Sequence, residues 1–406
     1  MKTFSLALCI IILGVVAGTA MAAATPPAVE VHGYLQVREY INTVIDDSRD
    51  TGTGVITDEK KKSHLEFERV SLSGLARLGE GKVAYGEVYI HPWLLNSDPS
   101  FLYLESLYLD VPQTPDVKAR LGKGRNQCFG IVPAYGNRKF SNYSPLEEAF
   151  TMDRVLGVQA MSTFAGNSLN FAVLNSQRPG TRYIGMAADS QLDIGDPARG
   201  GSLPRTTVAH LCNRDVPADR SGDLEFDARL GRQMGCFNVG LSGRLGRLDS
   251  TDLAFLTGKF GSQVDGQDRR QYGLDVTYKR APYYGTLQYY AGPTGGIGQS
   301  GYEILFGVEP SKQCTWPWDD LSGACKGLFV RYTKLDIDVV HDIASPITWD
   351  TSQFAASWVV PLPWGSQPGL GAKWLQIEYE WNHEDVPNGG DQIPNNVFFV
   401  ELFVAF

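Results

Sequence analysis

Beyond its N-terminal segment, the chain lacks any apolar run close to the roughly 20 residues that a helix needs to cross a bilayer. It also shows few of the amphipathic helical patterns and continuous apolar strands that are usual in a soluble chain of 406 residues. Aromatic residues nevertheless make up 11% of the chain, and glycine occurs 44 times. These features disfavour both a helical membrane protein and an ordinary soluble mixed fold.

Positive charge is also scarce. The chain has 36 Lys and Arg against 45 Asp and Glu, a formal net charge of −9. Nucleic acid binding requires a basic face, and the basic run Lys60–Lys62 directly follows Asp58 and Glu59 in a polar stretch. We therefore expect no nucleic acid partner.

Residues 1–22 have the composition of a secretory signal peptide. Lys2 is the only charge before Glu30, an apolar run extends from Phe4 to Val16, and Ala20-Met21-Ala22 offers a cleavage site. Removing this segment leaves residues 23–406 as one mature domain, with a formal charge of 35 − 45 = −10.

Cysteine is sparse and its number in the mature chain is odd. Of the six, Cys9 lies in the predicted signal peptide. In an oxidising compartment we expect disulfides between Cys314 and Cys325 and between Cys212 and Cys236, with Cys128 left over. The chain has no C-x-x-C and its His are scattered, which indicates neither a metal site nor covalently bound haem. No cofactor is expected.

What the chain does contain is an alternation of apolar and polar residues, in segments of roughly 8 to 12 residues separated by Gly, Pro, Asn and Asp. The clearest segments are KWLQIEYEW, LEFDARLGR, YGLDVTYKR and VEVHGYLQVREY. In the first, Leu375, Ile377 and Tyr379 share one face, and Gln376 and Glu378 share the other. This period of two predicts β-strands with one apolar and one polar face.

The position of the aromatic residues separates two folds that share this alternation. A soluble sandwich also has half-buried strands. Tyr278, Trp358 and Trp381 lie near segment ends, where a membrane barrel places amphipathic rings at the level of the lipid headgroups. The pattern therefore favours an all-β transmembrane antiparallel barrel.

The C-terminal segment NNVFFVELFVAF fits a barrel for a further reason. Phe398, Val400, Leu402, Val404 and Phe406 lie on one face, and in water such a strand would be an unprotected edge. In a closed barrel it pairs with the first strand and its apolar face meets lipid. A terminal Phe of this kind resembles the recognition signal of outer-membrane barrels in Gram-negative bacteria. The resemblance implies an outer-membrane location and recognition of Phe406 by the barrel assembly machinery.

A second resemblance covers about a third of the chain. The run LESLYLDVPQTPDVKARLGKGRNQCFGIVPAYGN, followed by RVLGVQAMSTFAGNSLNFAVLNS, resembles the N-terminal half of the phosphate-selective porin (O and P type) family. The matching positions are Glu105, Gly122 to Arg125, Phe129-Gly130, Arg154, Gly157 and Val158. The sequence departs from the family at Asn126-Gln127-Cys128, where a Pro is common, and its later half does not match.

The resemblance implies a passive channel and, because porins of that family are commonly trimeric, a homotrimer. It does not imply phosphate as the solute, because no arginine ladder can be placed. Chain length agrees with a channel: 406 − 22 = 384 residues correspond to about 16 strands, in a range of 16 to 18. Barrels of that size leave an aqueous lumen.

Charged residues at lumen-facing positions are the candidates for lining this pore. We expect the segment from Phe129 to Thr151 to fold into the lumen as a constriction, with Arg138-Lys139 facing Glu147-Glu148, although an external solvated loop fits the same residues. The full set of pore-lining candidates is Glu87, Lys118, Arg120, Arg138, Lys139, Glu147, Glu148, Glu225, Asp227, Arg229, Glu378 and Glu380. Their mixed signs predict weak selectivity, tilted toward cations by the acidic balance.

Two alternatives remain open. The barrel could serve as a sleeve or docking site for a secreted partner such as a multihaem cytochrome, through loops such as Ala291 to Gly301. It could also be a hydrolase with a rim His; the candidates are His91, His210, His341 and His383, the last in an expected turn, His383-Glu384-Asp385. No convincing G-x-S-x-G, H-E-x-x-H or Walker A motif accompanies them. We therefore expect a channel for small hydrophilic solutes or ions, and no enzyme.

Overall fold

The structure is a computed structural model, and it describes most of the chain apart from the N-terminal segment and several connections. The described residues are 28–44, 48–49, 56–57, 63–90, 102–131, 139–141, 143–151, 154–175, 224–248, 250, 253–254, 257, 262, 264–308, 327–338, 350–362, 373–385 and 396–406. The predicted signal peptide, residues 1–22, lies outside them. Among these residues, no helix has the length and apolar character to span a bilayer.

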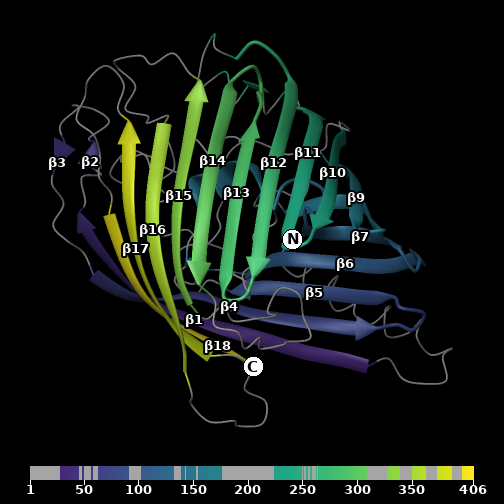
Figure 1. The fold of residues 1–406 in the computed structure, drawn as a ribbon, viewed down its shortest axis with the longest axis horizontal. Helices are drawn as coiled ribbons and strands as arrows, with labels where there is room; N and C mark the ends of the chain where they lie inside the picture. The colour runs from purple at the N-terminus through teal and green to yellow at the C-terminus, as the bar shows by residue number, and fades with distance from the viewer. Residues whose placement is uncertain are drawn as a thin grey trace.

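The fold is a closed antiparallel barrel of 16 strands, at the lower end of the predicted range. Each strand pairs with its neighbours along the chain, and β1 pairs with β18 to close the sheet (Figure 1). The barrel strands are β1 (Ala28–Val44), β4 (Ser63–Arg77), β5 (Val83–Ile90), β6 (Leu102–Thr114), β7 (Val117–Arg125), β8 (Arg154–Phe164), β9 (Asn167–Asn175), β10 (Leu224–Met234), β11 (Phe237–Arg247), β12 (Asp268–Arg280), β13 (Tyr283–Ala291), β14 (Gly298–Val308), β15 (Gly327–Asp338), β16 (Asp350–Pro361), β17 (Lys373–Asp385) and β18 (Asn396–Ala405). The short strands β2 (Ser48–Arg49) and β3 (Ile56–Thr57) pair with each other.

The two faces of the barrel have the reverse of the usual distribution of polarity. On β10, Leu224, Phe226 and Leu230 are 43–50% exposed on the outside, whereas Glu225 and Asp227 on the inner face are fully buried. The same arrangement holds on the other predicted strands, where outward Leu274 and Trp381 are exposed and inward polar residues are buried. Because an exposed apolar belt is stable only against lipid, this is the surface of a membrane-spanning barrel.

Aromatic side chains on the outer face gather toward the strand ends, as predicted. Toward one rim, Phe237 packs on Tyr278 with ring centroids 5.0 Å apart, and Trp358 is 54% exposed. Toward the other rim, Phe354 packs on Trp381 at 5.2 Å. Rings in these places suit the two headgroup layers of a bilayer.

The two rims differ in their connections. Short turns join β4 to β5, β6 to β7, β8 to β9, β10 to β11 and β12 to β13, all at the rim where β18 ends, which we call the short-turn rim. At the opposite rim, the expected long loop Ala291–Gly301 is only the short connection 292–297, because β13 and β14 extend into it. The prediction of a turn at His383-Glu384-Asp385 is also wrong, because these residues form the end of β17 and pair with β16.

The barrel closes at the very end of the chain. Phe406 and Gly33 exchange two backbone hydrogen bonds of 2.8 Å, which continue the β1–β18 ladder beyond Tyr34 and Ala405. A Cβ atom on Gly33 would lie 2.7 Å from the Phe406 ring and 2.6 Å from the Ser71 carbonyl oxygen. Glycine at this position therefore lets the terminal ring approach the backbone of β1 closely.

We expect Gly33→Ala to lower the thermal stability of the barrel, because the added methyl group displaces Phe406 from the closing strand pair. The measurement is heat modifiability, the temperature at which the folded band is lost in gel electrophoresis. Gly74→Ala on the neighbouring strand is the matched control, since its Cβ would meet no atom within 4 Å. Equal transition temperatures for the two variants would contradict this account of closure.

Candidate functional site: the lumenal loop and the charged inner wall

The described parts of the segment between β7 and β8 lie against the inner wall of the barrel, as was predicted for Phe129 to Thr151. These parts, residues 126–131, 139–141 and 143–151, contact side chains of the inner wall; we call them the lumenal loop. The loop contains one short helix, α2 (Pro145–Phe150), which begins with a capping box between Ser144 and Glu147. The cap satisfies backbone N–H groups that water cannot reach in this packed position.

Arg244 on β11 forms the first attachment of the loop. Its guanidinium pairs with Asp227 at 3.1 Å and with Glu225 at 3.3 Å, and all three side chains are fully buried. It also stacks over the ring of Phe129 at 4.3 Å and donates a 3.3 Å hydrogen bond to the carbonyl oxygen of Phe150, at the end of α2. One arginine thus joins the wall carboxylates to both ends of the loop.

The start of the loop is held by hydrogen bonds next to this arginine. The amide of Asn126 donates to Asp227, the backbone N–H of Gly130 donates to Ser242 Oγ at 2.9 Å, and that of Ile131 donates to the Tyr290 hydroxyl at 3.0 Å. Gly130 has φ = 65° and lies against Tyr290, so a side chain here would be both strained and obstructed. The chain therefore turns sharply into the lumen at this residue.

Arg331 on β15 forms the second attachment. It lies 3.6 Å from Glu147 of α2 and 3.9 Å from Glu380 of β17, and its guanidinium stacks over Phe140 at 4.3 Å. The arrangement repeats that of Arg244, with a wall arginine between carboxylates and a loop phenylalanine. An arginine suits this role because its planar fork bonds and stacks at the same time.

Residues 139–141 and 143 of the lumenal loop, which we call the tip, are bound to the last two strands. The backbone N–H of Ser141 donates to Glu378 at 2.6 Å, and its hydroxyl donates to Glu401 on β18. Gln376 bridges Lys139 and Glu378, with its amide 3.4 Å from the Lys139 carbonyl oxygen and 2.8 Å from the carboxylate. These carboxylates are almost fully buried, so they serve as acceptors for the loop.

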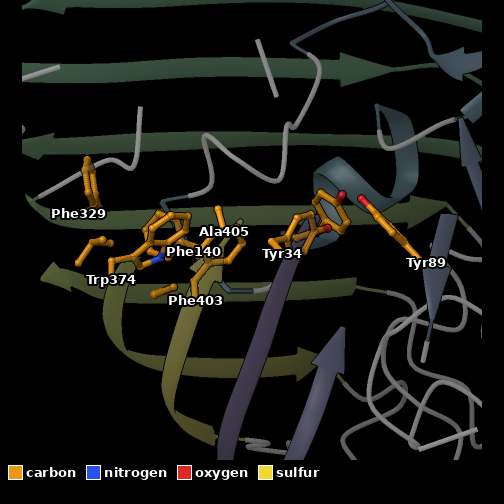
Figure 2. Packing of buried hydrophobic residues seen from close by; sticks show 10 residues of the cluster. Tyr34, Tyr89, Phe140, Phe329, Trp374, Phe403 and Ala405 are labelled. Carbon is orange, nitrogen blue, oxygen red and sulfur yellow. The ribbon is translucent and has the colours of Figure 1, made fainter. Parts of the chain in front are cut away.

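Apolar packing completes the attachment of the tip. Phe140 and Tyr143 of the loop are buried with Tyr34, Phe329, Trp374 and Phe403, which point inward from four strands (Figure 2). Trp374 stacks on Phe403 with ring centroids 3.7 Å apart. The lumen therefore contains an aromatic core of its own, formed between loop and wall.

Glycines of the inner wall make room for the larger groups. A Cβ atom on Gly301 would lie 2.7 Å from Leu146 of α2, so β14 offers a shallow seat for the helix. On β11, a Cβ atom on Gly240 would overlap the guanidinium of Arg229, which lies flat on the wall and pairs with Asp275. These close approaches give the loop and the wall charges fixed positions.

The wall formed by β5 to β7 carries a separate charged group. Asp110 pairs with Arg120 at 2.8 Å and with Lys118 at 3.0 Å, and Arg120 stacks over Tyr108 at 3.7 Å. The Lys118 side chain is 45% exposed, against 11% for Arg120 and 13% for Arg229. Glu87 on β5 accepts hydrogen bonds from Ser71 and Tyr85 at 2.7 and 2.9 Å.

The structure gathers six of the predicted charges into three groups. Glu225 and Asp227 meet at Arg244, Glu378 and Glu380 lie on β17 beneath the loop tip, and Lys118 and Arg120 share Asp110. Lys139 places its ammonium 3.8 Å from the Tyr284 ring centroid, and the wall partner of Glu147 is Arg331. Arg138 and the side chain of Glu148 lie outside the described residues.

Several residues that build this site did not stand out in the sequence, above all Arg244, Arg331, Ser141 and Glu401. Arg244 and Glu401 do have a signal, because each occupies an inward position in an alternating strand whose outward residues are apolar. Ser141 has none, since its role depends on a fold of the loop that brings it to strands more than 200 positions away.

The structure corrects one disulfide prediction and leaves the other untested. Cys236 is a free thiol in the turn between β10 and β11, at the short-turn rim. Because Cys236 is free, the predicted Cys212–Cys236 disulfide is wrong in this structure. Cys212, Cys314 and Cys325 lie outside the described residues, and the Cys314–Cys325 disulfide stays a prediction.

Known structures share this fold, whereas sequence comparison finds no relatives. An anion-selective porin from Comamonas acidovorans matches with a TM-score of 0.50 at 12% identity, over 93% of this chain and 99% of that one. OmpF from Salmonella typhi, in complex with daunomycin, matches with a TM-score of 0.54 at 8% identity, over 93% of this chain and 97% of that one. No protein-family model and no curated protein matches the chain.

These likenesses define the class of fold. The chain is a membrane-spanning β-barrel with a porin-type architecture. The resemblance to the phosphate-selective O and P type family gains no support from the sequence comparisons, so membership of that family stays a prediction.

Cys128 provides a chemical probe of the loop. Its side chain is fully buried, and burial, reinforced by the negative charge of Asp227, raises the pKa of this thiol far above its ordinary value. Thiolate is the reactive form, so we expect iodoacetamide at mildly alkaline pH to label Cys236 and to leave Cys128 unmodified until the protein is denatured. Site-resolved mass spectrometry provides the measurement, and equal labelling of the two in the folded barrel would contradict the buried position of Cys128.

Replacing Arg244 tests the first attachment. We expect Arg244→Met to cost about 3–5 kcal/mol, because it leaves Asp227 buried without its cation, whereas Glu225 keeps its ion pair with Arg269. The labelling of Cys128 should increase as the loop start separates from the wall. Arg229→Met is the matched control, since it also removes a cation from a buried carboxylate, Asp275, and no hydrogen bond or ion pair joins Arg229 to the described loop residues. If the control exposed Cys128 as much as Arg244→Met does, the effect would reflect general loss of stability.

Proposed function

We propose that this protein is a porin of the outer membrane, a water-filled channel for passive diffusion of small hydrophilic solutes or ions. The observation that supports it best is the loop folded against a charged inner wall, because such a loop narrows the lumen of a barrel. A barrel of 16 strands is wide enough to retain water beside such a loop.

The charges of the wall favour weak selectivity. The wall arginines Arg244 and Arg331 are buried between carboxylates. The neighbouring negative charges therefore largely cancel their electrostatic effect on ions in the lumen. What remains is the acidic balance of the chain, which attracts cations weakly. The proposal includes no phosphate specificity.

The wider biology of the proposal rests on analogy. A homotrimer is inferred from the predicted resemblance, and recognition of the terminal Phe406 by the barrel assembly machinery is inferred from its position at the end of β18. The partners are then outer-membrane lipid and the diffusing solute, with no cofactor and no catalytic role.

The sleeve for a secreted partner is the second candidate, and the loop argues against it. A sleeve needs an unobstructed interior, whereas here Phe129, Phe140 and α2 occupy the space beside the wall. For a rim hydrolase, no observation in the described part of the chain favours the proposal.

Single-channel recording in a planar bilayer with a KCl gradient tests the channel. We expect stable ohmic steps and a small reversal potential of the sign that indicates cation preference. A folded barrel without steps would favour the sleeve, and a strong anion preference would contradict the proposed selectivity.

A pair of variants, measured in the same recording, tests which charges determine the ion selectivity. Lys118→Gln removes a charge that faces the lumen and should shift the reversal potential further toward cations. Lys82→Gln also removes a lysine from an ion pair, here with Glu80, but Lys82 lies in the exposed turn between β4 and β5 and not on a barrel strand. Equal shifts for the two variants would mean that the wall by β7 does not border the ion path.

A further inference from the structure

The seam between β1 and β18 is the place where the two ends of the chain close the barrel. Every other neighbouring pair of strands is also joined by a connection of the chain, but β1 and β18 are held by their ladder and side chains. Opening of the barrel therefore starts most easily at this seam, because no covalent connection limits the separation of its strands.

The polar contacts of the loop tip bridge this seam. Glu401 on β18 accepts a hydrogen bond from the Ser141 hydroxyl of the loop and another, of 2.6 Å, from the Gln36 amide on β1. Glu401 also lies opposite Arg38 of β1 in the strand register. A single carboxylate thus joins the first strand, the last strand and the loop.

The apolar contacts bridge it as well. Tyr34 on β1 stacks on Phe403 of β18 with ring centroids 4.9 Å apart, and both belong to the buried cluster that includes Phe140 and Tyr143 of the loop (Figure 2). Tyr34 is only 2% exposed and Phe403 only 3%, so the cluster keeps water away from the inner side of the seam. Exclusion of water strengthens the ladder hydrogen bonds beneath it.

We propose that the lumenal loop is an internal clamp on the closing seam of the barrel, in addition to any effect on passage through the lumen. Part of the binding surface for the tip exists only when β1 and β18 are paired, because it combines Tyr34 with Glu401 and Phe403, and Gln36 holds Glu401 from β1. Complete docking of the tip therefore requires closure and in turn stabilises it. This role is independent of which solute, if any, the barrel admits.

Hydrogen–deuterium exchange in detergent micelles, resolved by mass spectrometry, measures the clamp directly. We expect Ser141→Ala to increase exchange about tenfold or more in peptides within 34–41 and 397–405, because it removes a hydrogen bond to a charged acceptor. Peptides from β11 and β12, far from the loop tip in strand order, should keep their wild-type rates.

Two further variants serve as a second test and as a control for this experiment. Glu401→Gln keeps the size of the side chain and should cause the same local increase, so the test stands even if one substitution disturbs folding. Leu146→Ala is the matched control, since it weakens the loop at its seat on Gly301 of β14, away from the seam. Its effect should appear in β14 and β15 instead.

The outcomes separate clearly. Faster exchange confined to β1 and β18 supports the clamp. Unchanged exchange at the seam, or an equal increase in all strands, overturns it. A protein that fails to conduct in a bilayer but shows the local increase would refute the proposed channel and leave the clamp intact.

Discussion

The structure depends on one constraint: the backbone of a strand that faces lipid has no water to bond with, so each N–H and C=O must find a partner in the sheet. The sheet meets this constraint by closing on itself, down to the paired bonds of Gly33 and Phe406. Closure in turn forces every strand to present one face to lipid and the other to the lumen. The exposed apolar belt and the buried inner charges both follow from it.

Inside the closed sheet, the loop creates a second interior with a different chemistry. Removing charges such as Arg244 and Glu225 from water is costly unless they are paired and hydrogen-bonded, and here they are. Such networks add little net stability but allow one arrangement, because any shift leaves a buried charge alone. The arginines of the wall thus position the loop, and the charge left for a diffusing solute is smaller than the inventory of charged residues suggests.

The C-terminal strand, β18, shows which structural features the local sequence pattern predicts and which it does not. Its outward residues, such as Val400 and Leu402, were correctly predicted to share one face, and its pairing with β1 is confirmed. Its inward residues Phe399 and Phe403 are also apolar, which the alternation of a water-filled barrel does not explain. Phe403 is explained by a loop that begins more than 200 positions earlier and covers the inner side of the seam, whereas Phe399 packs under the guanidinium of Arg38 on β1.

The sequence was sufficient to predict an outer-membrane barrel of about 16 strands, from the alternation of apolar and polar residues, the chain length and the terminal Phe406. It also predicted the face of the strand for four carboxylates, Glu225, Asp227, Glu378 and Glu380, because strand geometry with a period of two is local. It was not sufficient to predict that Arg244 and Arg331 hold the loop, or that Cys236 stays unpaired. Those features depend on which strands become neighbours around the barrel and where the loop settles inside it. Contacts between residues far apart in the chain leave no periodic trace in either segment, so they appear only when the sheet has closed.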